Sequence, residues 1–102
     1  MANTFKNYRA SSVGKTARDV YRVGADTTSV MIGCNLANVG TSQIKADVLV
    51  AGAYVIKDVV IPTGAALSAL DGKIIIETGQ SVVVKTDTEE SCDVILSVLE
   101  QT

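Results

Sequence analysis

The sequence predicts an all-β domain, folded as a two-sheet antiparallel sandwich. Segments in which apolar and polar residues alternate recur about every ten residues. Clusters of glycine, proline, asparagine and aspartate separate these segments, and no helical period persists beyond a turn or two. The chain has 102 residues, 47% of them hydrophobic, which is the length of one small domain with one core. About seven or eight short strands fit a jelly roll or an immunoglobulin-like sandwich.

Two long alternating segments define the first part of the sandwich. Residues 28–39 predict a half-buried strand, residues 38–42 (NVGTS) have the composition of a turn, and residues 43–51 alternate again. We expect the two strands to form a hairpin. The side chains expected to face the core are Val30, Ile32, Cys34, Leu36, Ile44, Ala46, Val48 and Val50.

The second part of the chain contains shorter segments. Residues 53–61 are apolar on both faces apart from Lys57 and Asp58, and Pro62 ends this strand because proline has no N–H for the ladder. Asp71-Gly72 is the sequence of a type I′ turn and predicts a hairpin between residues 66–70 and 73–77. A valine-rich strand at residues 81–86 and a charged turn at 87–91 precede the last strand, residues 92–99. In that strand Cys92, Val94, Leu96 and Val98 are expected to face inward.

The charge is distributed unevenly along the chain. Residues 1–16 show weak patterning, and we expect an N-terminal arm there, followed by the sandwich at residues 17–102. The first 22 residues contain one acid, Asp19, and the rest of the chain contains four lysines against ten acids. This basic segment either remains solvated or docks on an acidic protein surface; the acidic body would repel nucleic acid. Its basic residues are Lys6, Arg9, Lys15, Arg18 and Arg22.

The composition excludes several classes of catalytic chemistry. The chain has no histidine, so it has no Ser-His or Cys-His pair, no histidine base and no histidine metal ligand. Gly14-Lys15-Thr16 resembles the end of a phosphate-binding loop, but Arg9 stands where that loop needs a glycine. We therefore expect no enzyme activity, no catalytic residue, no cofactor, no metal site and no small-molecule substrate.

The remaining sequence features concern redox state and location. Cys34 and Cys92 are expected to be reduced, buried and inert, although a single bridge between them stays open. The first ten residues lack the apolar core of a secretory signal, and no apolar run approaches 20 residues. We expect a soluble protein made in a cytoplasm, with no membrane partner.

Several apolar residues fall in the phase opposite the expected core. A two-sheet sandwich is usually wetted on its outer faces, so these side chains need another cover. Burial against identical copies is the simplest cover and predicts a homo-oligomer. The alternative is that a β-bulge shifts the phase assignment. The expected interface residues are Met31, Leu49, Val59, Val83, Ile95 and Leu99.

Several phrases resemble a family of small virion structural proteins of tailed phages, particularly phages of cyanobacteria and other aquatic bacteria. The phrases are residues 20–24 with the Thr-Thr turn after them, 30–39 (VMIGCNLANV), 56–64 (IKDVVIPTG), 75–81 (IIETGQS) and 92–100 (CDVILSVLE). The resemblance covers most of residues 3–100, in order and with similar spacing. This chain departs from the family pattern in the basic residues Arg18 and Arg22.

The resemblance implies a non-enzymatic protein present in many copies on a virion. Our leading hypothesis is a capsid cement or decoration protein that binds the shell as a homo-oligomer, with the basic segment as its particle-binding arm. The alternative is a neck or tail component, such as an adaptor, collar or fibre-attachment protein. A host-surface binding module would need an aromatic or metal-dependent patch that the sequence does not offer. The expected partners are therefore the chain itself and the major capsid protein or neck and tail proteins, on a virion assembled in the host cytoplasm.

Overall fold

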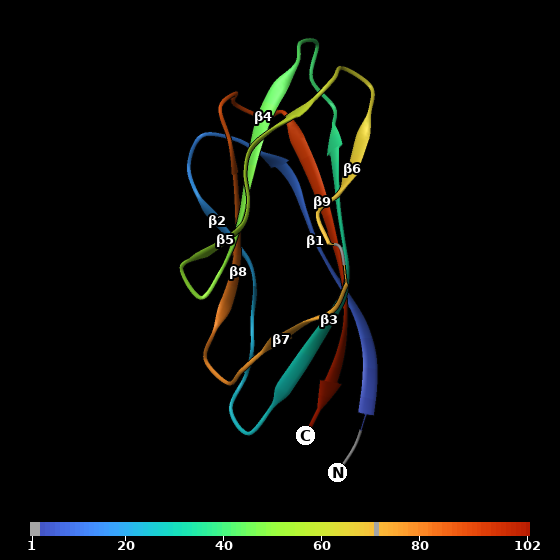
Figure 1. Cartoon of the computed structure of the whole chain (residues 1–102), viewed down its shortest axis with the longest axis vertical. Coiled ribbons are helices and arrows are strands. Elements are labelled where there is room, and N and C mark those ends of the chain that lie inside the picture. The colour runs from blue at the N-terminus through green and yellow to red at the C-terminus, as the bar shows by residue number, and fades with distance from the viewer. Residues whose placement is uncertain (1–2, 71) are drawn as a thin grey trace.

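The computed structural model describes residues 3–70 and 72–102. Over these residues the chain forms strands and the turns between them, and no helix there is long and apolar enough to cross a membrane. The molecule is elongated, 45 Å by 21 Å by 20 Å, with both chain ends at the same end of its long axis (Figure 1). The strands are β1 (Asn3–Val13), β2 (Arg18–Arg22), β3 (Thr28–Asn38), β4 (Ile44–Val50), β5 (Ala53–Ile61), β6 (Ala66–Ser68), β7 (Ile74–Ile76), β8 (Ser81–Thr86) and β9 (Cys92–Gln101).

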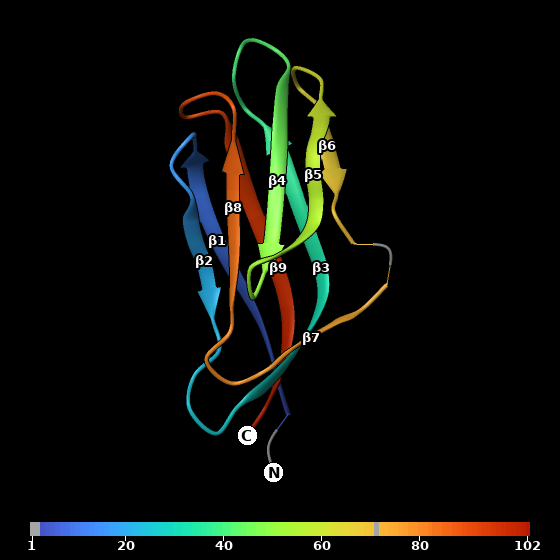
Figure 2. The ribbon, with the colours of Figure 1, turned by 60° about the vertical axis from the view of Figure 1, so that its left-hand side comes forward.

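The strands form two antiparallel sheets packed face to face (Figures 1 and 2). The first sheet has the order β1-β9-β3-β6, with β7 also paired to β3, and the second has the order β2-β8-β4-β5. Successive strands therefore alternate between the sheets over most of the chain. This topology is a jelly roll, with β6 and β7 sharing the place of one edge strand. The predicted all-β sandwich is confirmed, and the jelly-roll alternative is the one that matches the strand order.

The N-terminal segment is part of the sandwich. β1 pairs with β9 from Asn3 opposite Gln101 to Val13 opposite Cys92, so residues 3–13 form an edge strand of the first sheet rather than an arm beside the domain. Residues 3–7 are exposed on both faces, which explains their weak hydrophobic pattern. Backbone hydrogen bonds to β9 hold this part of the strand, and they leave no periodic signal in the sequence.

The expected hairpin between residues 28–39 and 43–51 does not form. β3 lies in the first sheet and β4 in the second, and the turn between them crosses the sandwich. The buried Asn38 side chain fixes the crossing: its Nδ2 donates to the carbonyls of Ser42 and Ile61, and its Oδ1 accepts from the Gly40 N–H, each at 2.9 Å. Asparagine can satisfy the backbone of a turn in this way, and here that turn joins two sheets.

The expected Asp71-Gly72 hairpin is also absent, and Asp71 itself lies outside the described residues. β6 and β7 both pair with β3, at Asn35–Ala37 and Ser29–Met31 respectively, instead of with each other. β3 is eleven residues long, so both short strands fit along one of its edges. There Leu67 and Ile74 pack against the core, and this burial outweighs the local turn preference.

The core lies between the two sheets and agrees with most of the predicted inward positions. β4 and β9 face it with the residues expected, including Ile44, Val48 and Leu96. The predicted strand end at Pro62 is confirmed, because β5 stops at Ile61. The largest fully buried side chains are Met31, Leu36, Ile44, Ile61, Ile76, Leu96, Val13, Val48, Val82, Val84, Val94 and Val98.

A β-bulge in β3 reverses the predicted phase at one end of that strand. The pairing with β9 shifts between Met31 and Gly33. Met31 is therefore fully buried, with 0% of its surface exposed, whereas Ile32 points outward. The expectation that Met31 faces outward and Ile32 faces the core was wrong, because an extra residue in one strand of a ladder inverts the side-chain alternation beyond it.

Candidate interaction surface

The outer face of the first sheet carries a continuous line of apolar side chains. Phe5 lies opposite Leu99, Leu99 lies opposite Val30, and Val30 lies opposite Ile75. These four residues, the apolar row, run straight across β1, β9, β3 and β7. On β9 and β3 the neighbours of the row along the strand, Val98 and Met31, are buried in the core, which fixes Leu99 and Val30 on the outside.

The residues at the two ends of the apolar row are the most exposed apolar side chains of the face. Phe5 has 74% of its surface exposed and Ile75 has 65%. Ile32 and Ile95 add two further exposed side chains above the row. We call these six residues the outer apolar face. A contiguous apolar surface of this kind on a small domain indicates a contact surface.

A shallow hollow interrupts the outer apolar face above the row. It has a volume of about 310 Å³ and is lined mainly by Phe5, Asn7, Ile32 and Ser97. The Ser97 hydroxyl donates to Asn7 Oδ1 at 3.1 Å. Gly33 lies opposite Ser97 in the ladder and has no side chain to fill the space. The hollow is therefore a recess on a face from which isoleucine and phenylalanine side chains otherwise project.

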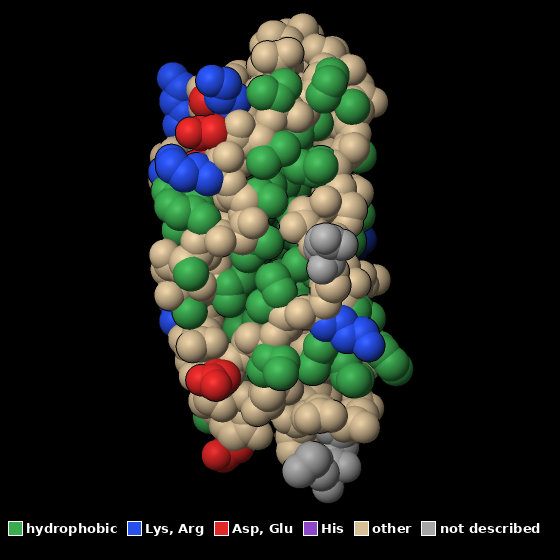
Figure 3. All heavy atoms as spheres, viewed as in Figure 1, with side chains coloured by type: hydrophobic (Ala, Val, Ile, Leu, Met, Phe, Trp, Pro, Cys, Tyr) green, Lys and Arg blue, Asp and Glu red, His purple; other side chains and the backbone are tan. Residues whose placement is uncertain are grey.

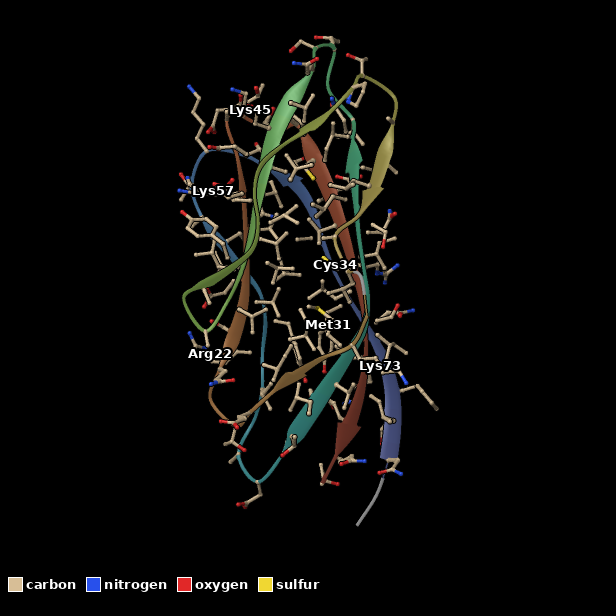
Figure 4. The ribbon with its side chains drawn as sticks, in the orientation of Figure 1. Arg22, Met31, Cys34, Lys45, Lys57 and Lys73 are labelled. Atoms are coloured by element: carbon tan, nitrogen blue, oxygen red, sulfur yellow. The ribbon has the colours of Figure 1, made fainter. Side chains whose placement is uncertain are left out.

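The outer face of the second sheet has a different character. Its positions include Lys45, Lys57, Lys85 and Asp47, and in Figure 3 charged side chains gather along this side of the molecule. Figure 4 shows Lys45, Lys57 and Arg22 on the same side, with Met31 and Cys34 between the sheets. The apolar strip in the middle of Figure 3 lies between the two sheets. Half-buried residues such as Ile56 and Leu67 pack against the core.

The apolar side chains of the second outer face are largely covered within the chain. Leu49 lies opposite Tyr54 on one side and Val83 on the other. Lys57 Nζ lies 4.9 Å from the centre of the Tyr54 ring, which is a cation–π contact. The aliphatic part of the Lys57 side chain also covers apolar surface. Both Leu49 and Val83 are only half exposed. The first sheet therefore has the larger unpartnered apolar face.

The six residues expected at an oligomer interface are divided by the structure. Ile95 and Leu99 lie on the outer apolar face, and Leu49 and Val83 lie together on the outer face of the second sheet. Val59 is half-buried on the edge strand β5, opposite Ala46. Met31 is in the core. Phe5 and Ile75 were not identified from the sequence, because finding them requires knowledge of which strands are neighbours. Val30 and Ile32 were expected to face the core, and the bulge in β3 places them on the outer face instead.

The five basic residues of the N-terminal segment do not form one patch. Arg9 lies on the outer face of the first sheet opposite Ile95. Lys6 points the other way and pairs with Glu100 at 3.2 Å. Arg18 donates to the Ser11 carbonyl at 2.7 Å, while Arg22 donates to the Gly79 carbonyl and pairs with Asp19.

Lys15, the fifth of these residues, follows β1 and has an exposed side chain. Its backbone N–H donates to Glu89 Oε1 at 2.8 Å. In a phosphate-binding loop a backbone N–H of this kind holds a phosphate oxygen, whereas here it binds a carboxylate of the same chain. Gly14 is needed for a different reason: a Cβ there would lie 3.0 Å from Glu89 Cα and 3.1 Å from Glu90 N. The Gly-Lys-Thr sequence therefore serves the packing of the Asp87–Ser91 turn.

A polar cluster joins the two sheets near the chain ends. Glu100 Oε2 accepts hydrogen bonds from Tyr21 at 2.6 Å and Tyr8 at 2.8 Å, and the two tyrosine rings stack with centroids 4.2 Å apart. Because the hydroxyl hydrogen of Tyr21 is engaged in its bond to Glu100, the Ser29 hydroxyl donates to the Tyr21 oxygen. These bonds tie β1, β2, β3 and β9 together.

The electrostatics of this cluster follow from its geometry. The Tyr21 hydrogen bond, followed by those of Tyr8 and Lys6, holds the pKa of Glu100 below its ordinary value despite partial burial. Burial, and then the bond to Glu100, raises the pKa of Tyr8 to about 12 and raises the pKa of Tyr21 further. The cluster therefore favours an ionised Glu100 between neutral tyrosines, which is an arrangement that stabilises the fold.

Among residues 3–70 and 72–102, no group of three or more histidine, cysteine or acidic side chains is placed to hold a metal ion. Cys34 and Cys92 are both buried and unbridged. Burial raises the pKa of Cys34 to about 12 and that of Cys92 to about 11. Thiols in this state are poor nucleophiles at neutral pH.

Comparison with known proteins shows similarity in fold. No protein-family model matches the chain, and no curated protein sequence matches it. A protein of Bacillus endospore appendages, which are disulfide-linked pili, aligns with a TM-score of 0.58 and 15% identity over 99% of this chain and 87% of that chain. A chain of the T13 IBDV viral particle aligns with a TM-score of 0.57 and 12% identity over 96% of this chain. The alignment spans 30% of the viral chain, so this protein corresponds to less than a third of its length.

Proposed function

We propose that this protein is a non-enzymatic structural component of a phage virion, a cement or decoration protein that binds the capsid surface as a homo-oligomer. The outer apolar face carries the proposal. Burying one exposed side chain such as Phe5 contributes about 1.5–3 kcal/mol, so a neighbour that covers six such residues gains a large stabilisation. A face of this kind is suited to repeated contacts in an assembly.

Three further observations support a structural role. The resemblance to small virion proteins of tailed phages covers most of residues 3–100. The two structures of similar fold come from a pilus and from a viral particle. The ionisable groups with shifted pKa also have evident structural partners, as Glu100 does with Tyr8 and Tyr21.

The basic residues are the second part of the proposed attachment. Lys15, Arg18 and Arg22 lie outside the outer apolar face, so they stay accessible when a neighbour covers that face. The Lys15 side chain makes no ion pair with the described residues, which makes it the best candidate for contact with an acidic shell. We propose the major capsid protein as that partner, on a virion assembled in the host cytoplasm.

Attachment is tested by adding purified protein to particles from which it has been stripped. Lys15→Glu should weaken retention on the particle, whereas Lys73→Glu, on the loop beside β7, should not. Equal retention of both variants would remove Lys15 from the contact. Substitution is preferable to deleting residues 2–16, because the deletion would remove the edge strand β1 and the buried Val13.

Copy number in purified particles distinguishes cement from a neck or tail component. A cement protein should be present in numbers comparable to the shell subunits, because it repeats with the lattice. A neck or tail protein should be present in the small number that one ring requires. Absence of the protein from purified virions would contradict both versions of the proposal.

A further inference from the structure

The outer apolar face can pair with itself by symmetry. β9 lies between β1, which carries the projecting Phe5, and β3, which carries Val30 and Ile32. The hollow lined by Phe5, Ile32 and Ser97 lies beside these residues. A two-fold rotation about β9 brings the side chains of β1 in one copy over those of β3 in the other at the same level.

We propose that two copies of this chain pack face to face through the outer apolar faces, related by a two-fold axis parallel to β9. This inference deepens the proposed function and rests on it for its role in the virion. In this arrangement Leu99 meets Leu99 of the partner subunit, and Phe5 lies over Val30 of the partner subunit beside the hollow. Phe5, Leu99 and Val30 of one copy thus cover the same three residues of the other, and Ile75 lies at the edge of the contact.

The size of the face fits a stable pair. The three strands that overlap, about 4.8 Å apart, and the ten residues of β9, rising about 3.4 Å each, give a face of roughly 14 Å by 34 Å, or about 490 Å². Two copies would bury roughly 1,000 Å² in total, which is about the minimum for a specific interface. Sheets that pack face to face interdigitate their side chains at about 10 Å separation.

The charges on the face also permit self-pairing. Among the outward positions of β1, β3 and β9 between the levels of Ile95 and Gln101, Arg9 is the one charged side chain. The proposed axis places Arg9 over Asn35 of the partner subunit and keeps the two arginines on opposite sides of β9. A face with so little charge gives no electrostatic preference for a strongly acidic or basic partner, whereas its apolar row matches its own copy.

Sedimentation of the full chain tests the pairing with a matched pair of variants. Ile95 on the outer apolar face and Val60 on β5 are 43% and 44% exposed, and each lies opposite a cation, Arg9 and Lys45 respectively. Ile95→Glu should weaken the dimer at least about tenfold, as loss of a central apolar contact does. Val60→Glu adds the same charge beside the same kind of partner and should leave the dimer unchanged.

Cross-linking tests the position of the axis. Leu99→Cys should form a covalent dimer with a short bifunctional maleimide, because a residue beside a two-fold axis lies opposite its own counterpart, at a sheet separation of about 10 Å that is too long for a direct disulfide. Val83→Cys, at a half-buried outward position of the second sheet, should not. The native thiols are buried and give little background. Leu99→Cys keeps an uncharged side chain, so it remains informative if Ile95→Glu fails to fold.

A folded wild-type protein that sediments as a monomer would overturn the inference. So would a dimer that persists in folded Ile95→Glu, or a dimer in which Leu99→Cys does not cross-link. A monomer that still binds stripped particles would leave the capsid-binding part of the proposed function intact and would show that the shell, rather than a second copy, covers this face. A dimer that is absent from purified virions would leave this inference intact and would contradict the proposed function.

Discussion

The Tyr21 hydroxyl donates a 2.6 Å hydrogen bond to Glu100 Oε2, and this bond joins β2 of the second sheet to β9 of the first. Tyr8 on β1 donates to the same oxygen, and Lys6 pairs with the other. One carboxylate therefore connects the N-terminal strand to both sheets. Because a hydrogen bond to a charged group contributes about 1.5–3 kcal/mol, this cluster is a substantial part of what holds β1 in place.

Acid should weaken the fold through Glu100. Its pKa is lower in the folded protein than in the unfolded chain, so its contribution is complete above the unfolded value of about 4.3 and is lost as the pH falls through the folded value. Urea unfolding followed between pH 7 and pH 3 should show this loss. Glu100→Gln should lower stability at pH 7 and flatten the profile below about pH 4.3. An unchanged acid limb in this variant would assign the loss to other carboxylates.

The close approach of Gly14 to the Asp87–Ser91 turn predicts sensitivity to a single methyl group. A Cβ at Gly14 would meet the backbone of Glu89 and Glu90 at 3.0–3.1 Å, so Gly14→Ala should destabilise the protein by about 1–3 kcal/mol, as overpacking does. Gly24 has nothing within 4 Å of a Cβ, and Gly24→Ala is the matched control, expected to be neutral or slightly stabilising. Thermal unfolding of both variants gives the comparison. Equal stabilities would mean that the turn moves away at little cost.

The strands that the sequence predicted best are those whose faces differ most in burial. β9 alternates between buried and more exposed side chains because one of its faces is in the core. β4 places the expected Ile44, Ala46 and Val48 in the core, although Asp47 is buried as well. The prediction failed at β3, where a bulge between Met31 and Gly33 reverses the alternation, and a bulge has no distinct signature in apolar residues. β1 was missed because its first five residues are exposed and held by the ladder to β9.

The candidate surface could be predicted only in part for a related reason. Ile95 and Leu99 were expected to point outward from the period of one strand alone. Phe5 and Ile75 join them only through the register of β1 with β9 and of β7 with β3, which is a long-range property. The local turn preference of Asp71-Gly72 predicted that residues 73–77 pair with residues 66–70. The place of Ile75 beside Val30 in the apolar row could therefore not be predicted from the sequence.

The turn between β4 and β5 leaves room for a stabilising substitution. Val50 pairs with Ala53 across Ala51 and Gly52, which have φ of 50° and 82°, the left-handed pair of a type I′ turn. Alanine is disfavoured there, whereas asparagine tolerates this region and is preferred at the first position. Ala51→Asn should stabilise the protein by about 0.5–1 kcal/mol and raise its Tm by roughly 2–8 °C. Ala51→Val, which is β-branched, should lower the Tm; the reverse order would contradict the turn assignment.

The two cysteines should be inert in the folded protein. Both are buried and free, and burial raises the pKa of each thiol, to about 12 for Cys34 and about 11 for Cys92. At pH 8 the thiolate fraction is therefore small and inaccessible, so a thiol-reactive reagent should label the native protein slowly and the urea-unfolded protein at both positions. A reducing agent should change neither the Tm nor the oligomeric state, because any assembly contact must form without these thiols. Rapid labelling of either cysteine under native conditions, measured by mass spectrometry, would show that the sandwich opens at that strand.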